Sequence, residues 1–178
     1  MPLTTRFSAG LAALVVLAVG AGCSPYGAHS QGPLRLGGNP SELCMVHPEH
    51  GDAVIGDAIT NEGNSSVTIE SVDLIDATNL DHLDSYLFPM DGDDDFVPGA
   101  VSTEPEGPWE EAAWETVQDP FKFEVQAHTQ VSIAVAIDTT VAQRNGTAEA
   151  IRVKYSAGGR QYTAQTSTTI ELSATSCS

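Results

Sequence analysis

The sequence predicts an all-β fold, a single antiparallel β-sandwich of about seven short strands. Three observations indicate this fold. Apolar and polar residues alternate in most segments after Pro40, turn residues separate these segments, and no sustained helical period is found. Strand–helix–strand alternation is missing too, which argues against a parallel sheet. The 178 residues, 41% of them hydrophobic, are enough for one domain with its own core.

The first predicted strands are joined by a short turn. Residues 54–61 alternate between apolar and polar side chains, and the Glu-Gly-Asn-Ser sequence of residues 62–65 is typical of a turn. In residues 67–74 the apolar positions move from odd to even numbers, so we expect a β-bulge near Ser71. Residues 83–89 form a further, shorter candidate strand.

The last part of the chain supplies the central strand and a hairpin. Residues 131–137 place bulky apolar side chains on one face and small ones on the other, which suits a central strand covered on both faces. Residues 151–155 alternate apolar and basic side chains, as expected for a strand with one wet face. The glycine pair that follows predicts a hairpin turn, with residues 161–172 as the return strand.

An acidic insertion at about residues 90–119 interrupts the strand pattern. Twenty acidic residues and no basic one lie between Arg35 and Lys122, in a chain whose formal net charge is −17. Residues 109–117 are compatible with a short helix, and alternation resumes at residues 121–125. A net charge this negative repels phosphate groups and therefore excludes nucleic acid as a partner. It either steers cations to the protein or keeps the domain soluble.

The N-terminus, residues 1–22, reads as an export signal. One basic residue precedes an apolar run of about 18 Å in helical form, too short for the roughly 30 Å hydrocarbon core of a membrane. Residues 19–23 resemble the lipobox of bacterial lipoproteins. That resemblance implies a lipid on Cys23 and a position on the extracytoplasmic face of the cell membrane. The alternative is ordinary cleavage, with Cys23 as an incidental thiol.

The mature chain is expected to begin with a tether. Residues 23–40 hold the lipidated cysteine and then three prolines and four glycines, a composition typical of a flexible linker. The folded domain is expected at residues 41–178, with Cys44 and Cys177 near its two ends. Outside the cytosol these two thiols favour a disulfide. A metal thiolate or redox site is the weaker alternative, because the sequence has no Cys-x-x-Cys.

Two segments carry a resemblance to known proteins. Residues 56–69 resemble the strand, Asn-x-Gly turn and Val-Thr-Ile strand that open immunoglobulin-like exported domains. Together with residues 152–162 and the final cysteine, they are similar to small exported lipoproteins of high-GC Gram-positive bacteria. The resemblance implies an immunoglobulin-like sandwich from Cys44 to Cys177, and it supplies no activity. The Cys…Trp…Cys spacing of true immunoglobulin domains is missing.

The acidic insertion contains a candidate calcium loop. Asp91, Asp93 and Asp95 alternate in the way that carboxylate ligands open such a loop. Phe96 occupies the position of the turn glycine, and Ser102 that of the closing glutamate. The residues therefore form either a calcium site of another geometry or a loop of solvated carboxylates.

A second metal hypothesis rests on histidine and methionine. Imidazole and thioether ligands suit copper, and the sequence places Met45, His47 and His50 close together, with His82 and Met90 further along. The spacing matches no copper motif.

We expect no enzymatic activity. The sequence contains no Gly-x-Ser-x-Gly nucleophile motif, and no histidine has an evident partner. Trp109 and Trp114 are the only tryptophans. They either pack onto the sandwich or mark a binding surface.

These observations predict a membrane-anchored extracytoplasmic lipoprotein of unknown role, acting as a non-enzymatic binding module with an envelope protein as candidate partner. The alternative is a metal-ion-binding accessory protein of the cell envelope, specific for calcium or copper.

Overall fold

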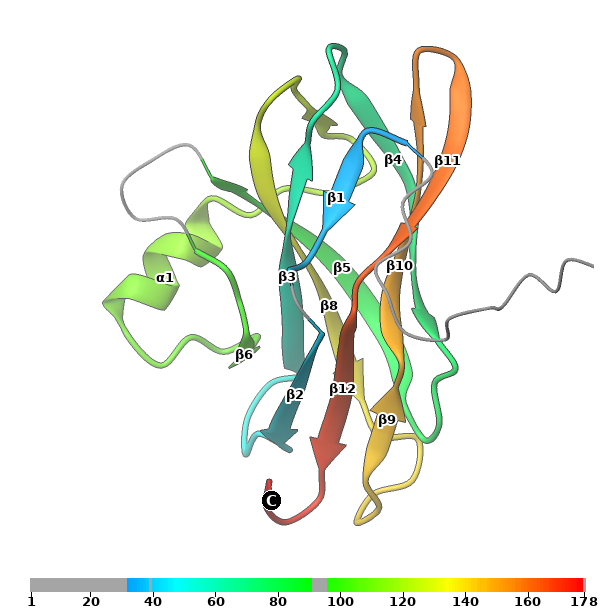
Figure 1. Ribbon diagram of the computed structural model, residues 1–178. Coiled ribbons are helices and arrows are strands. Elements are labelled where there is room, and N and C mark those ends of the chain that lie inside the picture. The colour runs from blue at the N-terminus through cyan, green and yellow to red at the C-terminus, as the bar shows by residue number, and fades with distance from the viewer. Residues whose placement is uncertain (1–31, 39, 91–95, 178) are drawn as a thin grey trace, which may run out of the picture.

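The computed structural model describes residues 32–38, 40–90 and 96–177 (Figure 1). The predicted signal, Cys23 and the candidate calcium ligands Asp91, Asp93 and Asp95 lie outside these residues. No helix within them is long and apolar enough to span a bilayer. In chain order the elements are β1 (Leu34–Leu36), β2 (Ser41–Val46), β3 (Ala53–Asn61), β4 (Val67–Ile75), β5 (Asp81–Met90), β6 (Ala100–Ser102), α1 (Pro108–Glu115), β7 (Glu124–Val125), β8 (Gln130–Asp138), β9 (Gly146–Ala148), β10 (Ala150–Ala157), β11 (Arg160–Gln165) and β12 (Thr168–Ser173).

The strands form a β-sandwich, as the sequence predicted, although the described residues contain twelve strands and not about seven. One layer is a five-stranded sheet in the order β1-β3-β8-β5, with β6 also paired to β3. The opposite layer consists of a four-stranded sheet, β11-β10-β4-β7, and a three-stranded sheet, β2-β12-β9 (Figure 1). Every pairing is antiparallel except that of β2 with β12, which is parallel. The predicted antiparallel sandwich is thus confirmed, with this parallel pair as an exception that the sequence did not indicate.

Strand β8 is covered on both faces, which confirms the central position predicted for it. It lies between β3 and β5. Its bulky side chains, Val131, Ile133, Val135 and Ile137, join the core between the sheets. Its small side chains Ala134 and Ala136 belong to a second cluster. Alanine at these positions leaves room for a further layer on the outer face of the sheet.

That further layer is built by α1 and the loops beside it, which cover the outer face of the five-stranded sheet (Figure 1). The ring of Phe88 lies at its centre, tilted against Phe96 and edge-on to Trp114. Pro108 opens the helix at a position where its missing N–H costs nothing. Glu110 and Glu111 lie in the first turn, where the helix dipole favours negative charge.

The predicted bulge and hairpin are both present. The pairing of β4 with β10 shifts register between Lys154 and Tyr155, which leaves one extra residue on β4 next to Ser71. The hairpin between β10 and β11 turns at Gly158 and Gly159, whose φ angles of 56° and 76° suit a glycine pair.

Three predictions of element boundaries are wrong. Strand β1 lies inside the expected linker, where the side chains of Leu34 and Leu36 are 0% and 2% exposed. The expected return strand, residues 161–172, divides into β11 and β12 in different sheets. The chain changes sheet at Thr166, whose N–H donates to the Ile151 carbonyl oxygen while its hydroxyl accepts from the Ile151 N–H.

The third wrong boundary concerns residues 121–125, of which only Glu124–Val125 is strand. Asp119 holds the preceding residues in a turn, because its carboxylate accepts from the Phe121 N–H at 2.9 Å and pairs with Lys122 at 2.6 Å. The side chain of Phe121 is consequently left 47% exposed.

The disulfide predicted from the cysteine positions is present. Cys44 on β2 and Cys177 beyond β12 are bonded, with their Cα atoms 5.7 Å apart. The bond closes a loop with a sequence separation of 133 residues, so it crosslinks nearly the whole domain.

Candidate functional site

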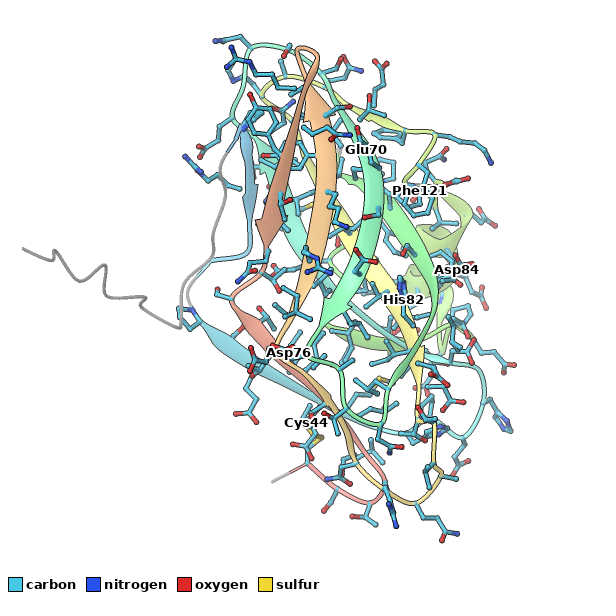
Figure 2. All side chains as sticks on the ribbon, turned by 90° about the vertical axis from the view of Figure 1, so that its right-hand side faces the viewer. Cys44, Glu70, Asp76, His82, Asp84 and Phe121 are labelled. Carbon is cyan, nitrogen blue, oxygen red and sulfur yellow. A yellow bond between two sulfur atoms is a disulfide. The ribbon has the colours of Figure 1, made fainter. Side chains whose placement is uncertain are left out.

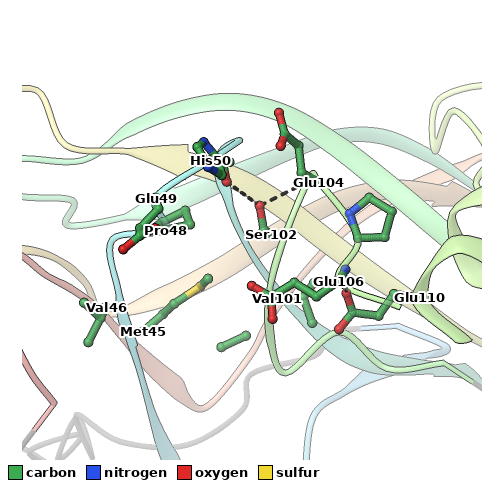
Figure 3. A pocket seen from close by; sticks show the side chains of 12 residues that line it. Met45, Val46, Pro48, Glu49, His50, Val101, Ser102, Glu104, Glu106 and Glu110 are labelled. Atoms are coloured by element: carbon green, nitrogen blue, oxygen red, sulfur yellow. Dashed lines mark hydrogen bonds between the residues drawn. The ribbon is translucent and has the colours of Figure 1, made fainter. Parts of the chain in front are cut away.

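The best-formed hollow among the described residues lies where β2 and β6 approach each other at one side of the sandwich (Figure 3). Its volume is about 520 Å³, within the range of ligand pockets. Three segments line it: the end of β2 with the loop after it, β6 with the loop after it, and the start of α1. The lining residues are Met45, Val46, Pro48, Glu49, His50, Ala100, Val101, Ser102, Glu104, Pro105, Glu106 and Glu110. We call this hollow the acidic cavity.

Ser102 ties the two loops of the acidic cavity together. Its buried hydroxyl donates to the carbonyl oxygen of His50 at 2.7 Å and accepts from the N–H of Glu104 at 3.1 Å (Figure 3). Gly51 permits this close approach. Its φ is +70°, and a Cβ at this position would lie 2.6 Å from the Thr103 hydroxyl oxygen. The walls of the cavity are thus fixed by buried contacts.

The charge of the cavity is all of one sign. Its four ionisable carboxylates are Glu49, Glu104, Glu106 and Glu110, and no lysine or arginine lines it. None of the four forms an ion pair with any other described residue. Met45, Val46 and Pro48 supply an apolar wall beside them. A ligand that fits this lining carries positive charge together with some apolar surface.

His47 anchors the loop that carries one wall of the cavity. Its Nε2 lies 2.8 Å from Asp138 Oδ1 at the end of β8, and its Nδ1 lies 3.0 Å from the Pro48 carbonyl oxygen. Both of these oxygens accept, so both contacts are hydrogen bonds only when both ring nitrogens carry hydrogens. The hydrogen bond to Asp138 accordingly raises the pKa of His47. The imidazolium form leaves no nitrogen free to bind copper.

The remaining copper candidates do not converge. Met45 and His50 line the acidic cavity, whereas His82 and Met90 lie at the two ends of β5. Within the described residues, no group of three or more histidine, cysteine or acidic side chains is arranged to hold a metal ion. The calcium hypothesis concerns Asp91, Asp93 and Asp95, which lie outside the described residues.

One histidine has a serine partner that the sequence did not reveal. On β5, His82 Nε2 lies 2.9 Å from both the Ser85 hydroxyl oxygen and the Asp84 carbonyl oxygen; Figure 2 shows His82 and Asp84 near each other on this strand. A carbonyl oxygen only accepts, so Nε2 carries the hydrogen and is not placed to take the proton of Ser85. Ser85 is also buried, at 6% exposure. This geometry does not resemble an activated nucleophile.

The two tryptophans have different environments. Trp114 packs its ring edge-on to Tyr86 at 5.0 Å and to Phe88 at 5.3 Å, so it is a packing residue and not part of a binding surface. Its Nε1 is buried without a hydrogen-bond partner among the described residues. Trp109 contacts Phe96 with its ring centroid at 4.8 Å but remains 56% exposed. Of the two, only Trp109 remains a candidate for a binding surface.

A second hollow of about 550 Å³ lies on the sheet formed by β2, β12 and β9. Carboxylates and threonines line it, with Ala148 and Ile170 as its apolar residues. Asp76 and Thr78, from the loop between β4 and β5, also line it. Its glutamates, among them Glu42 and Glu149, provide a comparison of equal charge for the acidic cavity.

Sequence reasoning identified the acidic insertion but not the cavity. Glu104, Glu106 and Glu110 belong to the insertion, yet nothing in their spacing brings them opposite Glu49, which is more than fifty residues earlier. Ser102 was noted only as a mismatch to a calcium loop. The one available signal was Gly51, a glycine between His50 and Asp52 that marks a close approach of chain segments.

Comparison with known proteins finds no matching family and no similar curated sequence. Two solved structures are distantly similar to this chain. The VesB protease of Vibrio cholerae is 11% identical over 79% of this chain, with a TM-score of 0.39, and this chain spans 32% of the VesB chain. PapD-like domain 7 of human CEP192 is 10% identical over 95% of this chain and 100% of that chain, with a TM-score of 0.34. Neither likeness bears on function.

Proposed function

We propose that this protein is a membrane-anchored extracytoplasmic lipoprotein that acts as a non-enzymatic binding module, and that the acidic cavity receives a cationic ligand. The observation that carries the binding site is the lining of this cavity: four carboxylates without a basic partner, beside an apolar wall. Four carboxylates that line one cavity without a lysine or arginine give it a negative potential, so the cavity is electrostatically complementary to positive charge.

Two features support export and anchoring. The Cys44–Cys177 disulfide is of the kind that persists in oxidising compartments and is rare in the cytosol. The segment before Cys23 has the charged start, apolar middle and small residues of a lipoprotein signal. Two or more acyl chains on Cys23 would hold the protein stably at a membrane, whereas one chain binds only marginally.

The absence of catalysis is part of the proposal. The Ser85–His82 contact has the wrong tautomer for base catalysis, and its serine is buried. The glutamates of the acidic cavity stand on three separate segments that a bound cation would bridge. They therefore fit a role in recognition.

Calorimetric titration with spermidine tests the binding site. The double variant Glu104→Gln/Glu106→Gln removes two charges from the acidic cavity, and Glu42→Gln/Glu149→Gln removes two from the second hollow. We expect the first variant to weaken binding at least fivefold and the second to leave it within twofold of the unmodified protein. Equal weakening in both would show only non-specific attraction to net charge and would overturn the proposed site. A parallel titration with calcium separates this proposal from the metal-ion alternative.

Mass spectrometry of the protein from membrane fractions tests the anchor. We expect the mature chain to begin at Cys23 with its acyl groups attached. A chain that keeps residues 1–22 in a soluble fraction would contradict the anchoring.

A further inference from the structure

We propose that the ligand of the acidic cavity is an extended basic segment of a protein, which adds to the free edge of β6 as a further strand. This inference rests on the proposed function and names the class of partner. Three features of the described residues carry it: a strand edge without a partner on one wall, a second such edge on the other wall, and the charge between them.

The first feature is the outer edge of β6. This strand pairs with β3 on one side and with no other described strand. The Thr103 N–H donates to the Asp52 carbonyl oxygen at 2.9 Å, which fixes the phase of the antiparallel ladder. Bonded pairs alternate in such a ladder, so Val101 faces β3 and the backbone groups of Ala100 and Ser102 face away from β3. Ala100 is exposed, whereas Ser102 is only 7% exposed, so Ala100 provides the accessible part of this edge. All three residues of β6 line the acidic cavity.

The second feature is the outer edge of β2. In its parallel pairing with β12, the N–H groups of Ser41 and His47 donate to Ser167 and Ser173 carbonyl oxygens. Alternate residues of a strand point to opposite sides, so the backbone groups of Val46 face away from β12. Val46 also lines the cavity, and its side chain is 43% exposed. The cavity thus lies at an open margin of the sandwich, between edges of two different sheets.

An unpaired strand edge with a hollow beside it is the arrangement in which an added strand gains main-chain hydrogen bonds and places alternate side chains in pockets. The side chains of an extended segment point alternately to its two faces. In the acidic cavity one set meets Glu104, Glu106 and Glu110, while the other meets the apolar wall of Met45 and Pro48. A segment that alternates lysine or arginine with apolar residues is complementary both to the glutamates and to the apolar wall.

A second copy of this chain does not fit the cavity. Its own edges β2 and β6 contain no lysine or arginine, and the described residues 40–90 and 96–121 carry none at all. Pairing of two such edges would bring glutamates of one copy against glutamates of the other. Two copies therefore do not pair through these edges, and the partner that we propose is a different protein.

The test uses the full chain and a six-residue peptide, acetylated and amidated, that alternates lysine and valine. Two further peptides carry N-methyl groups on alternate backbone amides, one in each register. The methyl groups keep charge and side chains but block strand pairing along one edge. We expect the unmethylated peptide to bind at least tenfold more tightly than one of the methylated forms, with spermidine as the reference cation.

The outcomes separate this inference from the proposed function. If spermidine binds and all three peptides bind within twofold of one another, the cavity recognises charge alone and strand addition is overturned. If spermidine binds and the unmethylated peptide does not, strand addition is again overturned and the cationic site stands. If neither spermidine nor any peptide binds, both proposals fall.

A matched pair of protein variants tests whether the peptide pairs with the outer edge of β6. Ala100→Pro removes an outward N–H of β6 without removing a hydrogen bond to β3, whereas Ala100→Val keeps that N–H. We expect Ala100→Pro to lose at least fivefold in peptide affinity and to keep its affinity for spermidine, while Ala100→Val keeps both. Thermal melting establishes that both variants fold. Equal peptide affinity in the two folded variants would contradict pairing at β6.

Discussion

The core between the two sheets and the layer under α1 are built on opposite principles. The core is mostly aliphatic, with residues such as Ile133 and Val153 fully buried on regular strands beside the ring of Tyr155. The layer under α1 is richer in aromatic rings and is assembled from β5, a loop and the helix, with Phe88 in contact with both Phe96 and Trp114. The outer layer extends to Val101 on β6, which also lines the acidic cavity.

Two surfaces of the sandwich also differ in how their charges are paired. On the outer face of the four-stranded sheet, Asp73 lies 3.7 Å from Arg152 and 4.0 Å from Lys154, so charges of both signs mix. Around the acidic cavity the glutamates stand without a basic partner among the described residues. The outer face of the four-stranded sheet therefore pairs some of its own charges, whereas the glutamates of the acidic cavity have no basic partner among the described residues.

Loss of the disulfide is expected to have the largest effect on stability. Replacement of both Cys44 and Cys177 by alanine opens the loop that the disulfide closes, whose ends are 133 residues apart in the sequence. For a loop of this length the chain-entropy model gives a stabilisation of about 4–5 kcal/mol, which the variant would lose. We expect urea unfolding to show a loss of this order. A loss below about 1 kcal/mol would mean that the crosslink adds little to the sandwich.

The comparison between the two layers is tested most directly by one truncation in each. Ile133→Ala leaves a cavity in the fully buried core and is expected to cost about 3–4 kcal/mol. Trp114→Ala, in the half-buried outer layer, is expected to cost about 2 kcal/mol. Trp114→Phe is the control, because it keeps the ring contacts and removes the unpaired Nε1, and it should be close to neutral. A larger loss for Trp114→Ala than for Ile133→Ala would reverse the ranking of the layers.

A carboxyl group within the sandwich gives a smaller, pH-dependent effect. Burial raises the pKa of Asp57, against the opposing hydrogen bonds from the Thr168 hydroxyl at 3.1 Å and the Ala58 N–H at 2.8 Å. A raised pKa means that the folded state favours the protonated form, so stability from this group is lost as pH rises through its folded pKa. The free energy of unfolding of Asp57→Asn should therefore rise relative to that of the unmodified protein between pH 4 and pH 7, by on the order of 1 kcal/mol. Parallel unfolding curves at the two pH values measure it, and an opposite trend would contradict the assignment.

The smallest effect is expected at the loop beside the acidic cavity. The hydrogen bond to Asp138 raises the pKa of His47, so its contribution is present at low pH and is lost as pH rises through the folded pKa. Because the pair is more than 40% exposed, we expect His47→Gln to lower stability by only about 0.5 kcal/mol at pH 6 and less at pH 9. Thermal melting at both pH values measures the difference. An effect that grows with pH would contradict the ion pair.

The sandwich was predictable from the sequence because its core strands alternate. The alternation in residues 131–137 predicted a central strand. The shift of the apolar positions from odd to even numbers near Ser71 predicted the bulge. Strand β1 was missed because three residues flanked by glycines and prolines resemble a linker, and only burial under Tyr155 and β3 orders them. Tertiary contact decided this segment, and local pattern could not.

The acidic cavity could not be predicted for the same reason. Its walls come from β2, β6 and α1, which are distant in sequence and meet only because β6 pairs with β3. The parallel pairing of β2 with β12 also depends on a sheet change at Thr166 that no residue pattern marks. Charge in the insertion was visible in the sequence, but its convergence with Glu49 was a property of the fold.

Amide hydrogen exchange of the full chain, with and without the alternating lysine–valine peptide, tests the central claim most directly. If the open margin of the sandwich receives a basic strand, the amide protons of Ala100 and Ser102 exchange more slowly in the presence of the peptide, while those on the outer edge of β11 do not change. Slower exchange at β11 alone, or unchanged exchange at Ala100 and Ser102 under saturating peptide, would contradict it.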